Sequence, residues 1–318
     1  MPAILQSPVL PTPLAMTDAI FAFPECMTQG RELAALCDVP LLPVHVRRFP
    51  DGESLVRIEG KANTAFLYRS LDDPNAKLVE LVLAASALRD SGASRVILIA
   101  PYLAYMRQDM AFHEGEAVSQ KVVGRLLADH FDGITTVDPH LHRIASLAEV
   151  IKGIPAISVS AAPAISAALA QSAHEAAVLV GPDSESRQWV QSIAEPLGLE
   201  FLVGEKVRKG DRKVNLVVPG IEIVKGRSAV LVDDMISSGT TLIECAALLH
   251  AAGARSVAAI VTHALSREED LKRLAAAGIA PIRAADSTAS SIATIPLAGV
   301  LADAIRNRDW TASIRSCV

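Results

Sequence analysis

Short apolar runs alternate with longer helical stretches along most of the chain, and this alternation limits the fold more than any other feature. The runs are rich in branched and small residues, as in strands that are buried on both faces. The clearest are Val96–Ala100, Ile134–Val137, Val178–Val180, Ala229–Val232 and Val257–Val261. Helical patterns cover Lys77–Asp90, Ser119–His130, Ala161–Gln171, Ser186–Leu197 and Thr241–Ala252. The alternation predicts α/β domains with doubly wound parallel sheets.

The chain also repeats itself weakly at a separation of 161 residues. This shift places Asp72-Asp73 on Asp233-Asp234 and Gly92-Ala93 on Gly253-Ala254. It aligns apolar positions as well: Leu81 with Leu242, Leu88 with Leu249, and Val96 with Val257. We therefore predict two similar domains related by internal duplication, over residues 19–155 and 156–318, that are joined near residues 152–160.

Composition agrees with two such domains and excludes some partners. The 318 residues are 51% hydrophobic but only 4% aromatic, so the cores must be built mainly from Ala, Val, Leu and Ile. The net charge of −5 gives no overall positive field that would hold a nucleic acid. Because no apolar run approaches the roughly 20 residues that span a bilayer, we expect no membrane partner.

The cysteines and the first residues bear on localisation. The four cysteines have no CxxC spacing, which predicts reduced thiols in a cytoplasmic protein; they are Cys26, Cys37, Cys245 and Cys317. Residues 1–18 are predicted to be a disordered extension. Met1–Ala15 holds four prolines and no charged side chain, so it lacks the features of a signal peptide, and Met16 is an alternative start.

The most informative stretch is Val230–Leu242, where an apolar strand leads through two carboxylates into a small-residue turn that opens a helix. Backbone N–H groups at a helix N-terminus bind anions, and hydroxyls around Gly239 add donors; they belong to Ser237, Ser238, Thr240 and Thr241. Asp233 and Asp234 would repel a phosphate but suit the hydroxyls of a ribose. The stretch predicts a sugar-phosphate site, since simple helix capping needs one such residue. No Lys follows the Gly, so it is not a Walker loop.

This stretch resembles the phosphoribosyl diphosphate (PRPP) loop shared by type I phosphoribosyltransferases and ribose-phosphate pyrophosphokinases. Three further stretches resemble the pyrophosphokinases alone. Arg48–Glu53 is similar to a segment that contacts ATP from a neighbouring subunit, and Pro101–Asp109 to another ATP contact. Val137–His140 is similar to an Asp-Leu-His motif whose His is a magnesium ligand. The resemblance runs from about residue 20 to 310, and simple phosphoribosyltransferases lack the N-terminal half.

The resemblance implies a set of ATP-binding and metal-binding residues. Those expected at ATP are Phe49, Asp51, Gly52, Glu53, Arg107, Gln108, Asp109 and His140. Those expected at Mg²⁺ are His140 and Asp183 of the Pro182-Asp183 pair. Each also has an ordinary structural interpretation: Arg107–Asp109 as a solvated turn, Phe49 as a core residue, and His140 as a structural histidine. Their position after apolar strands, where open α/β sheets bind ligands, favours the binding roles.

A charged segment, Gly204–Arg212, follows the predicted strand Phe201–Val203. On composition alone it is an ordinary solvated hairpin. In the family a mobile catalytic loop with a Lys-x-Arg pattern occupies this place, which Lys206 and Arg208 fit. The implied ribose 5-phosphate contacts are Arg208, Asp233, Asp234, Ser237, Ser238, Gly239, Thr240 and Thr241.

The implied function is ribose-phosphate diphosphokinase, which transfers the β,γ-diphosphoryl group of Mg-ATP to the 1-hydroxyl of ribose 5-phosphate. The implied assembly is a homo-oligomer, a dimer or a multiple of dimers, that shares its ATP site between subunits. Two stretches depart from the family: Ser184–Arg187 replaces a Gly-rich continuation, and the loop reads Ser-Ser-Gly-Thr-Thr where many relatives have Asp-Thr-x-Gly-Thr.

Two alternatives remain open. A type I phosphoribosyltransferase would consume PRPP with a nucleobase and would leave the ATP-binding residues without a use. A non-catalytic regulatory paralogue should have lost its catalytic cations or metal ligands, whereas all of them are present here: Lys206, Arg208, His140 and Asp183.

Overall fold

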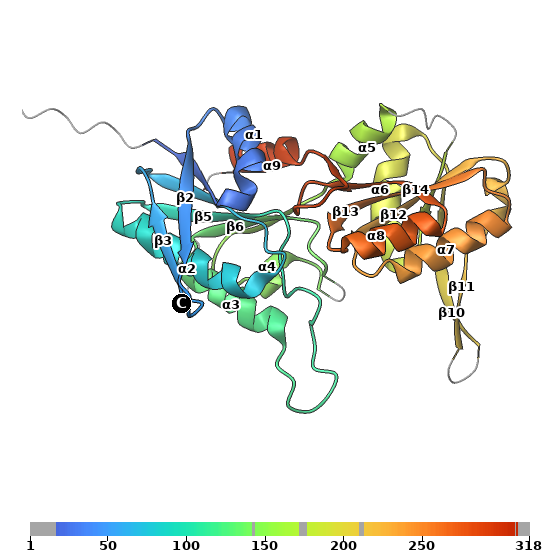
Figure 1. The fold of residues 1–318 in the computed structure, drawn as a ribbon, viewed down its shortest axis with the longest axis horizontal. Helices are drawn as coiled ribbons and strands as arrows, with labels where there is room; N and C mark the ends of the chain where they lie inside the picture. Colours follow the sequence, from blue (N-terminus) through green and yellow to red (C-terminus); the bar gives the residue numbers. More distant parts are fainter. Residues whose placement is uncertain (1–16, 142–143, 172–176, 210–212, 309, 311–318) are drawn as a thin grey trace, which may run out of the picture.

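The computed structural model describes residues 17–141, 144–171, 177–209, 213–308 and 310, without the side chains of 208, 209 and 213–215. Residues 1–16, which form most of the predicted extension, and Cys317 lie outside it. The described chain forms two sheets, each covered by helices, and a two-stranded hairpin that projects from the second unit (Figure 1). None of its helices combines the length and apolar character that a membrane crossing requires.

The first sheet has seven strands in the order β3-β2-β1-β4-β5-β6-β7. All neighbours are parallel except β2 and β3, which form an antiparallel hairpin at one edge. The strands are β1 (Ala19–Ala22), β2 (Leu41–Arg48), β3 (Ser54–Ile58), β4 (Thr64–Tyr68), β5 (Arg95–Ala100), β6 (Gly133–Val137) and β7 (Ala156–Val159).

The second sheet has six strands, all parallel, in the order β15-β14-β13-β12-β8-β9. They are β8 (Val178–Gly181), β9 (Phe201–Val203), β12 (Ser228–Ile236), β13 (Ser256–Ala264), β14 (Ile279–Ala285) and β15 (Ala293–Ile295). The projecting hairpin consists of β10 (Glu205–Lys209) and β11 (Lys213–Val217).

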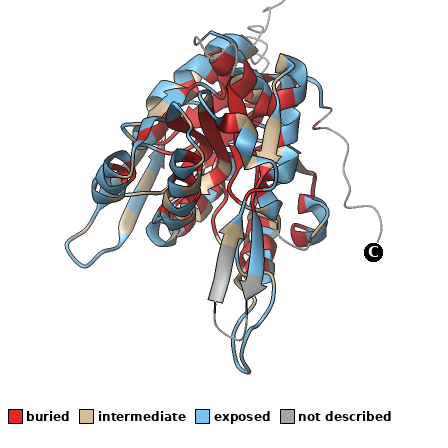
Figure 2. Ribbon diagram, turned by 90° about the vertical axis from the view of Figure 1, so that its right-hand side faces the viewer, coloured by how far each residue is buried: buried red, intermediate tan, exposed pale blue. Residues whose placement is uncertain are grey.

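Helices cover both faces of each sheet, so the buried residues form a central layer (Figure 2). They are α1 (Met27–Cys37), α2 (Pro74–Asp90), α3 (Ser119–His130), α4 (Leu147–Val150), α5 (Ala162–Ala170), α6 (Arg187–Leu197), α7 (Thr240–Ala251), α8 (Glu268–Ala276) and α9 (Ala298–Arg306). Three short 3₁₀ turns are η1 (Pro24–Cys26), η2 (Ser184–Ser186) and η3 (Ile221–Val224).

Three hydrophobic clusters follow from the alternation of side chains along the strands. Ile20 and its neighbour Phe21 point to opposite faces of the first sheet and join different clusters. One cluster contains buried residues from both sheets, including Ile20 and Val230. The two units therefore share a continuous core and do not meet only at their surfaces.

The order of the two sheets confirms the predicted pair of similar folds. Strands β2-β1-β4-β5-β6-β7 have the same order and connections as β9-β8-β12-β13-β14-β15. In both units a 3₁₀ turn and a helix follow the first strand, and that helix ends in a left-handed residue, Asp38 with φ 54° or Gly198 with φ 63°. We call the units the first and second halves.

The strand register corrects one detail of the predicted repeat. Arg95 of β5 and Ser256 of β13 are 161 residues apart, and their partners across the ladder are Thr64 and Ser228. Continuing along these strands, the pair Arg69-Ser70 takes the place of Asp233-Asp234. The first-half counterparts of those two carboxylates are therefore not Asp72-Asp73, because the two copies differ in length between strand and helix.

The halves exchange their last helices. Strand β7, which was predicted to begin the second domain, pairs with β6 in the first sheet, so the sheets divide the chain after β7 and not after residue 155. Helix α5 follows β7 but packs on α6 of the second half, and α9 follows β15 but packs on α1 and β7 of the first (Figure 1). Trp310, just beyond α9, packs edge-on against Phe66 of β4, with ring centroids 6.2 Å apart.

Candidate active site

The carboxyl ends of β5 and β6 in the first half face those of β8 and β12 in the second, and the predicted site residues gather there. Asp233 and Asp234 lie within β12, which continues to Ile236, so the strand does not end before the pair as the sequence suggested. Asp234 is buried and Asp233 is half-buried. The backbone N–H of Asp234 donates to Asp233 Oδ1 at 3.0 Å.

The predicted phosphate loop connects β12 to α7, as expected. Gly239 is the N-cap residue of α7, with a left-handed φ of 72°, and an added Cβ there would lie 2.9 Å from Leu274 Cδ2. Ser238 and Thr240 are exposed, and their hydroxyls lie 3.1 Å apart. The hydroxyls and the helix N-terminus thus share one open surface that an anion can reach.

Three carboxylates crowd the strand ends of the second half. Burial raises the pKa of Asp233 well above its usual range, and the nearby charges of Asp234 and Asp183 raise it further. Within the described residues, no group of three or more His, Cys, Asp and Glu side chains is arranged to enclose a metal ion. The crowding nevertheless gathers acidic groups beside the predicted phosphate loop.

A cation from the projecting hairpin meets this acidic group. Lys206 Nζ donates to Asp183 Oδ2 at 2.7 Å, and this bond is the main reason why the pKa of Lys206 is raised. Asp183 also caps η2 by accepting from the N–H of Glu185 at 3.1 Å. The second predicted cation, Arg208, lies on β10, but its side chain is outside the described part.

His140 joins the site from the first half. It follows the end of β6, and its Nδ1 forms a short hydrogen bond with Asp234 Oδ2. A cavity of about 1050 Å³ adjoins His140 and extends to the N-terminal end of α6, where Glu185 and Arg187 line it. His140 is thus placed between this cavity and the β12–α7 loop, and its short hydrogen bond is to Asp234 and not to Asp183, with which it was predicted to share the metal.

The two predicted ATP segments lie in different places. Arg107, Gln108 and Asp109 follow β5 at the edge of the sheet that also carries His140. Arg107 and Asp234 both act on the pKa of Tyr102, which burial raises, so these groups lie within electrostatic reach of one another. Phe49 belongs instead to the β2–β3 turn, on the far edge of the first sheet.

That turn is exposed. Phe49 donates its N–H to the carbonyl of Glu53 at 2.8 Å, Gly52 has φ 94°, and the Arg47 guanidinium lies 5.3 Å from the centre of the Phe49 ring. Asp51, Gly52 and Glu53 are all exposed. Within the described residues the fold does not bring this turn to the site of its own chain.

Two residues that the sequence analysis passed over lie at the centre of the site. Thr262 and His263 follow the apolar run of β13, and both contact Asp138, the residue after β6: Thr262 Oγ1 at 3.1 Å from Asp138 Oδ2, and His263 Nε2 at 3.2 Å from the Asp138 carbonyl. Polar residues directly after an apolar strand were the available signal, because strand ends carry the sites of open sheets.

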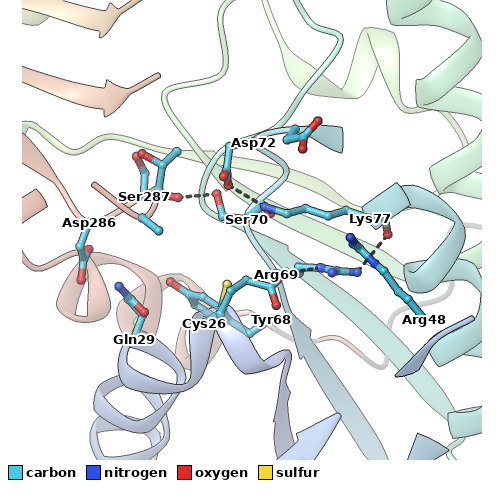
Figure 3. A pocket seen from close by; sticks show the side chains of 14 residues that line it. Cys26, Gln29, Arg48, Tyr68, Arg69, Ser70, Asp72, Lys77, Asp286 and Ser287 are labelled. Carbon is cyan, nitrogen blue, oxygen red and sulfur yellow. Dashed lines mark hydrogen bonds and ion pairs between the residues drawn. The ribbon is translucent and has the colours of Figure 1, made fainter. Parts of the chain in front are cut away.

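The halves also meet at a second place, which we call the second joint and which is the counterpart of this site (Figure 3). There the ends of β1 and β4 face the end of β14, around a cavity of about 280 Å³. Ser70, in the place of Asp234, donates its hydroxyl proton to the Ser287 carbonyl. Arg69, in the place of Asp233, is held by Glu25 at 2.8 Å and Glu80 at 2.6 Å. No histidine is among the described residues that line this cavity.

Comparisons with known proteins agree with these observations. A model described as the N-terminal domain of ribose phosphate pyrophosphokinase matches residues 19–130, and a phosphoribosyl transferase domain model matches residues 157–279. Ribose-phosphate pyrophosphokinase from Methanopyrus kandleri is 36% identical over 291 residues, which cover 91% of this chain and 98% of that protein. The protein of that name from Methanothermobacter thermautotrophicus is 34% identical over 280 residues, 86% of this chain and 95% of the relative.

A solved structure covers the same length. Phosphoribosylpyrophosphate synthetase from Mycobacterium smegmatis superposes with a TM-score of 0.78 at 26% identity, over 91% of this chain and 98% of that one. Both halves, in the same order, are therefore found in these relatives. The chain belongs to the ribose-phosphate pyrophosphokinase family.

Proposed function

We propose that the cleft between the halves carries out the diphosphokinase reaction of the family, with ribose 5-phosphate on the second half and ATP on the first. The observation that carries this assignment is the contact between His140 of the first half and Asp234 of the second. It brings the residues predicted for ATP and those predicted for the sugar phosphate to one place.

Ribose 5-phosphate is held by its two chemically different ends. Its phosphate accepts from the N-terminal N–H groups of α7 and from loop hydroxyls, those of Ser237, Ser238, Thr240 and Thr241. Its ring hydroxyls donate to Asp233 and Asp234. The crowded carboxylates favour a ligand that brings hydroxyl donors over one that brings negative charge.

ATP lies against His140 and the segment Arg107–Asp109, along the cavity beside His140. The 1-hydroxyl oxygen of the ribose attacks the β-phosphorus, the bond from that phosphorus to the α,β-bridging oxygen breaks, and AMP leaves with the bridging oxygen. The hydroxyl proton passes to solvent, and no side chain of the site is assigned as its base. Lys206 and Arg208 neutralise charge on the transferring group when the hairpin closes over it.

The donor set fits Mg²⁺. This ion prefers oxygen ligands, keeps several waters and needs few protein groups, so Asp183 and His140 would hold it together with phosphate oxygens of ATP. The three crowded carboxylates supply the negative charge that a divalent cation offsets. When bound, the ion would neutralise and orient the phosphate oxygens of ATP.

A second subunit completes the ATP site in this proposal. Asp51, Gly52 and Glu53 are exposed and Phe49 is half-buried in a turn at the far edge of the first sheet, where a partner subunit can reach them. Exposed apolar side chains lie on the neighbouring elements β3 and α2: Leu55, Val79 and Leu83. They are consistent with a surface that a second copy covers. The free thiols of Cys26, Cys37 and Cys245 agree with the reducing cytoplasm as its compartment.

The test is to incubate the purified protein with ribose 5-phosphate, ATP and Mg²⁺ and to measure AMP and PRPP. We expect equal amounts of both. A phosphoribosyltransferase would instead consume PRPP with a nucleobase in the absence of ATP, and a regulatory paralogue would form neither product. Formation of ADP in place of AMP would contradict the proposed transfer.

The shared site and the hairpin are tested together with two variants. Lys206→Ala is expected to lower kcat by about 10²–10³, as for loss of one group that stabilises transition-state charge. Phe49→Ala is expected to raise the KM for ATP. Because a mixed dimer has one site with both native residues, mixing the two variants should restore activity. Near-normal turnover of Lys206→Ala, or no recovery on mixing, would refute the respective assignment.

A further inference from the structure

The turn that carries His140 has an unfavourable backbone. Asp138, two residues before His140, has a left-handed φ of 35° and precedes Pro139, although a residue before proline favours extended conformations. A non-glycine residue in this region costs energy and persists only where its surroundings hold it. The position of His140 therefore depends on what holds Asp138.

Contacts from both halves meet at Asp138. Within the first half, its N–H donates to the Val159 carbonyl at 2.9 Å. The N–H of Ala161, just before α5, donates to its Oδ2 at 3.0 Å. From the second half, Thr262 donates to the same Oδ2 and His263 contacts the carbonyl, as described above.

His263 is itself fixed. It is 1% exposed, its Nδ1 lies 2.8 Å from Ser287 Oγ, and the ring of Tyr102 packs edge-on with centroids 5.0 Å apart. Burial lowers its pKa to about 4, so the ring is neutral near pH 7. A carbonyl only accepts, so Nε2 carries the proton and donates to the Asp138 carbonyl, while Nδ1 and the Thr262 carbonyl, 2.8 Å from Ser287 Oγ, compete for the one proton of the Ser287 hydroxyl.

At the second joint, the residue equivalent to Asp138 is Asp286, and it lacks these contacts. Asp286 follows β14 as Asp138 follows β6: its N–H donates to the Ile295 carbonyl at 2.9 Å, and it accepts from the Leu297 N–H at 2.8 Å. Among the described residues, no side chain of the other half donates to Asp286, and its φ is not left-handed. The additional contacts occur only in the copy that bears the functional histidine.

We propose that Thr262 and His263 are positioning residues of the active site. They hold Asp138 in its left-handed conformation, and so hold His140 in contact with Asp234 and at the metal–ATP side of the cleft. This inference rests on the proposed role of His140. In this proposal, β13 of the second half orients His140 of the first half.

The test uses Thr262→Val, which removes the donor but keeps the shape, and Thr262→Ser, which restores the donor. Thr135→Val is the matched control, because Thr135 is a buried β6 residue whose hydroxyl has no partner in the described structure. His263→Leu removes the second donor. Melting temperatures of all variants are recorded, so that loss of folded protein is not counted as loss of function.

Two measurements decide the proposal. In Thr262→Val and His263→Leu, the Mg²⁺ concentration for half-maximal activity should rise about tenfold, with the KM for ribose 5-phosphate unchanged. Hydrogen exchange of a peptide over residues 134–141 should become faster in the same variants. Thr262→Ser and Thr135→Val should behave as the wild type in both.

An unchanged Mg²⁺ requirement and unchanged exchange in both donor-removing variants would overturn the proposal. So would effects of equal size in Thr135→Val. If the wild type forms neither AMP nor PRPP, the proposed function fails, and the exchange measurement still decides whether Thr262 and His263 hold the turn.

Discussion

The two joints between the halves have the same construction and different chemistry. At each, the carboxyl ends of equivalent strands face one another: β12 against β6 at the active site, and β4 against β14 around the cavity of Figure 3. The joint at the active site presents Asp233, Asp234 and His140. The second joint presents Arg69 and Ser70. The guanidinium of Arg69 is already paired with two glutamates, and the hydroxyl of Ser70 donates to a backbone carbonyl.

The connection after the strand differs as well. Helix α2 begins at Pro74, six residues after Tyr68, whereas α7 begins at Thr240, eight residues after the equivalent Val232. The second half thus has the longer turn and the shorter helix, and its helix starts with N–H groups where the first has a proline. One fold provides both joints, which differ in a few side chains and in two loop residues.

The largest expected difference concerns the equivalent residues Asp234 and Ser70. Asp234→Ala removes the partner of His140 and the ribose contact that we propose, so we expect kcat/KM to fall about 10²–10³. Ser70→Ala should keep activity within about twofold and lower the free energy of unfolding by about 1 kcal/mol, the net value of one hydrogen bond. Steady-state kinetics and chemical denaturation of both variants test this. Equal losses of activity would mean that both joints take part in the reaction.

Two glycines with the same φ angle test whether the longer turn of the second half binds the sugar phosphate. Gly239→Ala adds a methyl group against Leu274 at φ 72°, which should raise the KM for ribose 5-phosphate about tenfold and lower the free energy of unfolding by about 2 kcal/mol. Gly226→Ala has the same φ of 72° with nothing within 4 Å, so it should cost about 1 kcal/mol and leave the KM unchanged. A raised KM in Gly226→Ala would show that backbone strain alone acts at a distance.

The smallest effect on activity is expected at Asp286, in the joint to which we assign no catalytic role. Burial raises its pKa from 3.8 to about 6. Since the folded state binds the proton more tightly, its contribution to stability is greatest below about pH 4 and is lost as the pH rises through 6. Asp286→Asn still accepts from Leu297 and should raise the free energy of unfolding by about 2 kcal/mol at pH 8, with no change at pH 4. Turnover should stay at the wild-type level. A destabilised variant at pH 8 would contradict the burial argument.

The sequence predicted local elements well where their ends carry clear signals. The helix expected over Ser119–His130 has those bounds in the structure, and the five apolar runs all lie within strands. The turn between β12 and α7 was predicted because its residue types are unusual for a simple cap, and its role as a phosphate loop stays a prediction. The position of Asp233 and Asp234 inside β12 was missed, since ladder pairing with β13 extends a strand beyond its apolar run.

What joins the halves was not predictable from local patterns. The apolar face of α5 or α9 shows that each helix covers a sheet, but not which one. The contacts of Thr262 and His263 with Asp138 link residues more than 120 positions apart. A single sequence carries no periodic signal for such pairs, and the assignment of Arg69-Ser70 as counterparts of the carboxylates required the strand register.

The exchanged helices bear on how such a chain arose and how it can be cut. A half-length chain ending after α5 would carry a helix without its own sheet to cover, and a sheet face without its helix. Two copies of such a chain would satisfy each other by swapping those helices, as in domain-swapped dimers. Joining the copies makes the swap intramolecular, at a high effective concentration. If the chain is cut between the two sheets, each half therefore loses a helix that covers its own sheet.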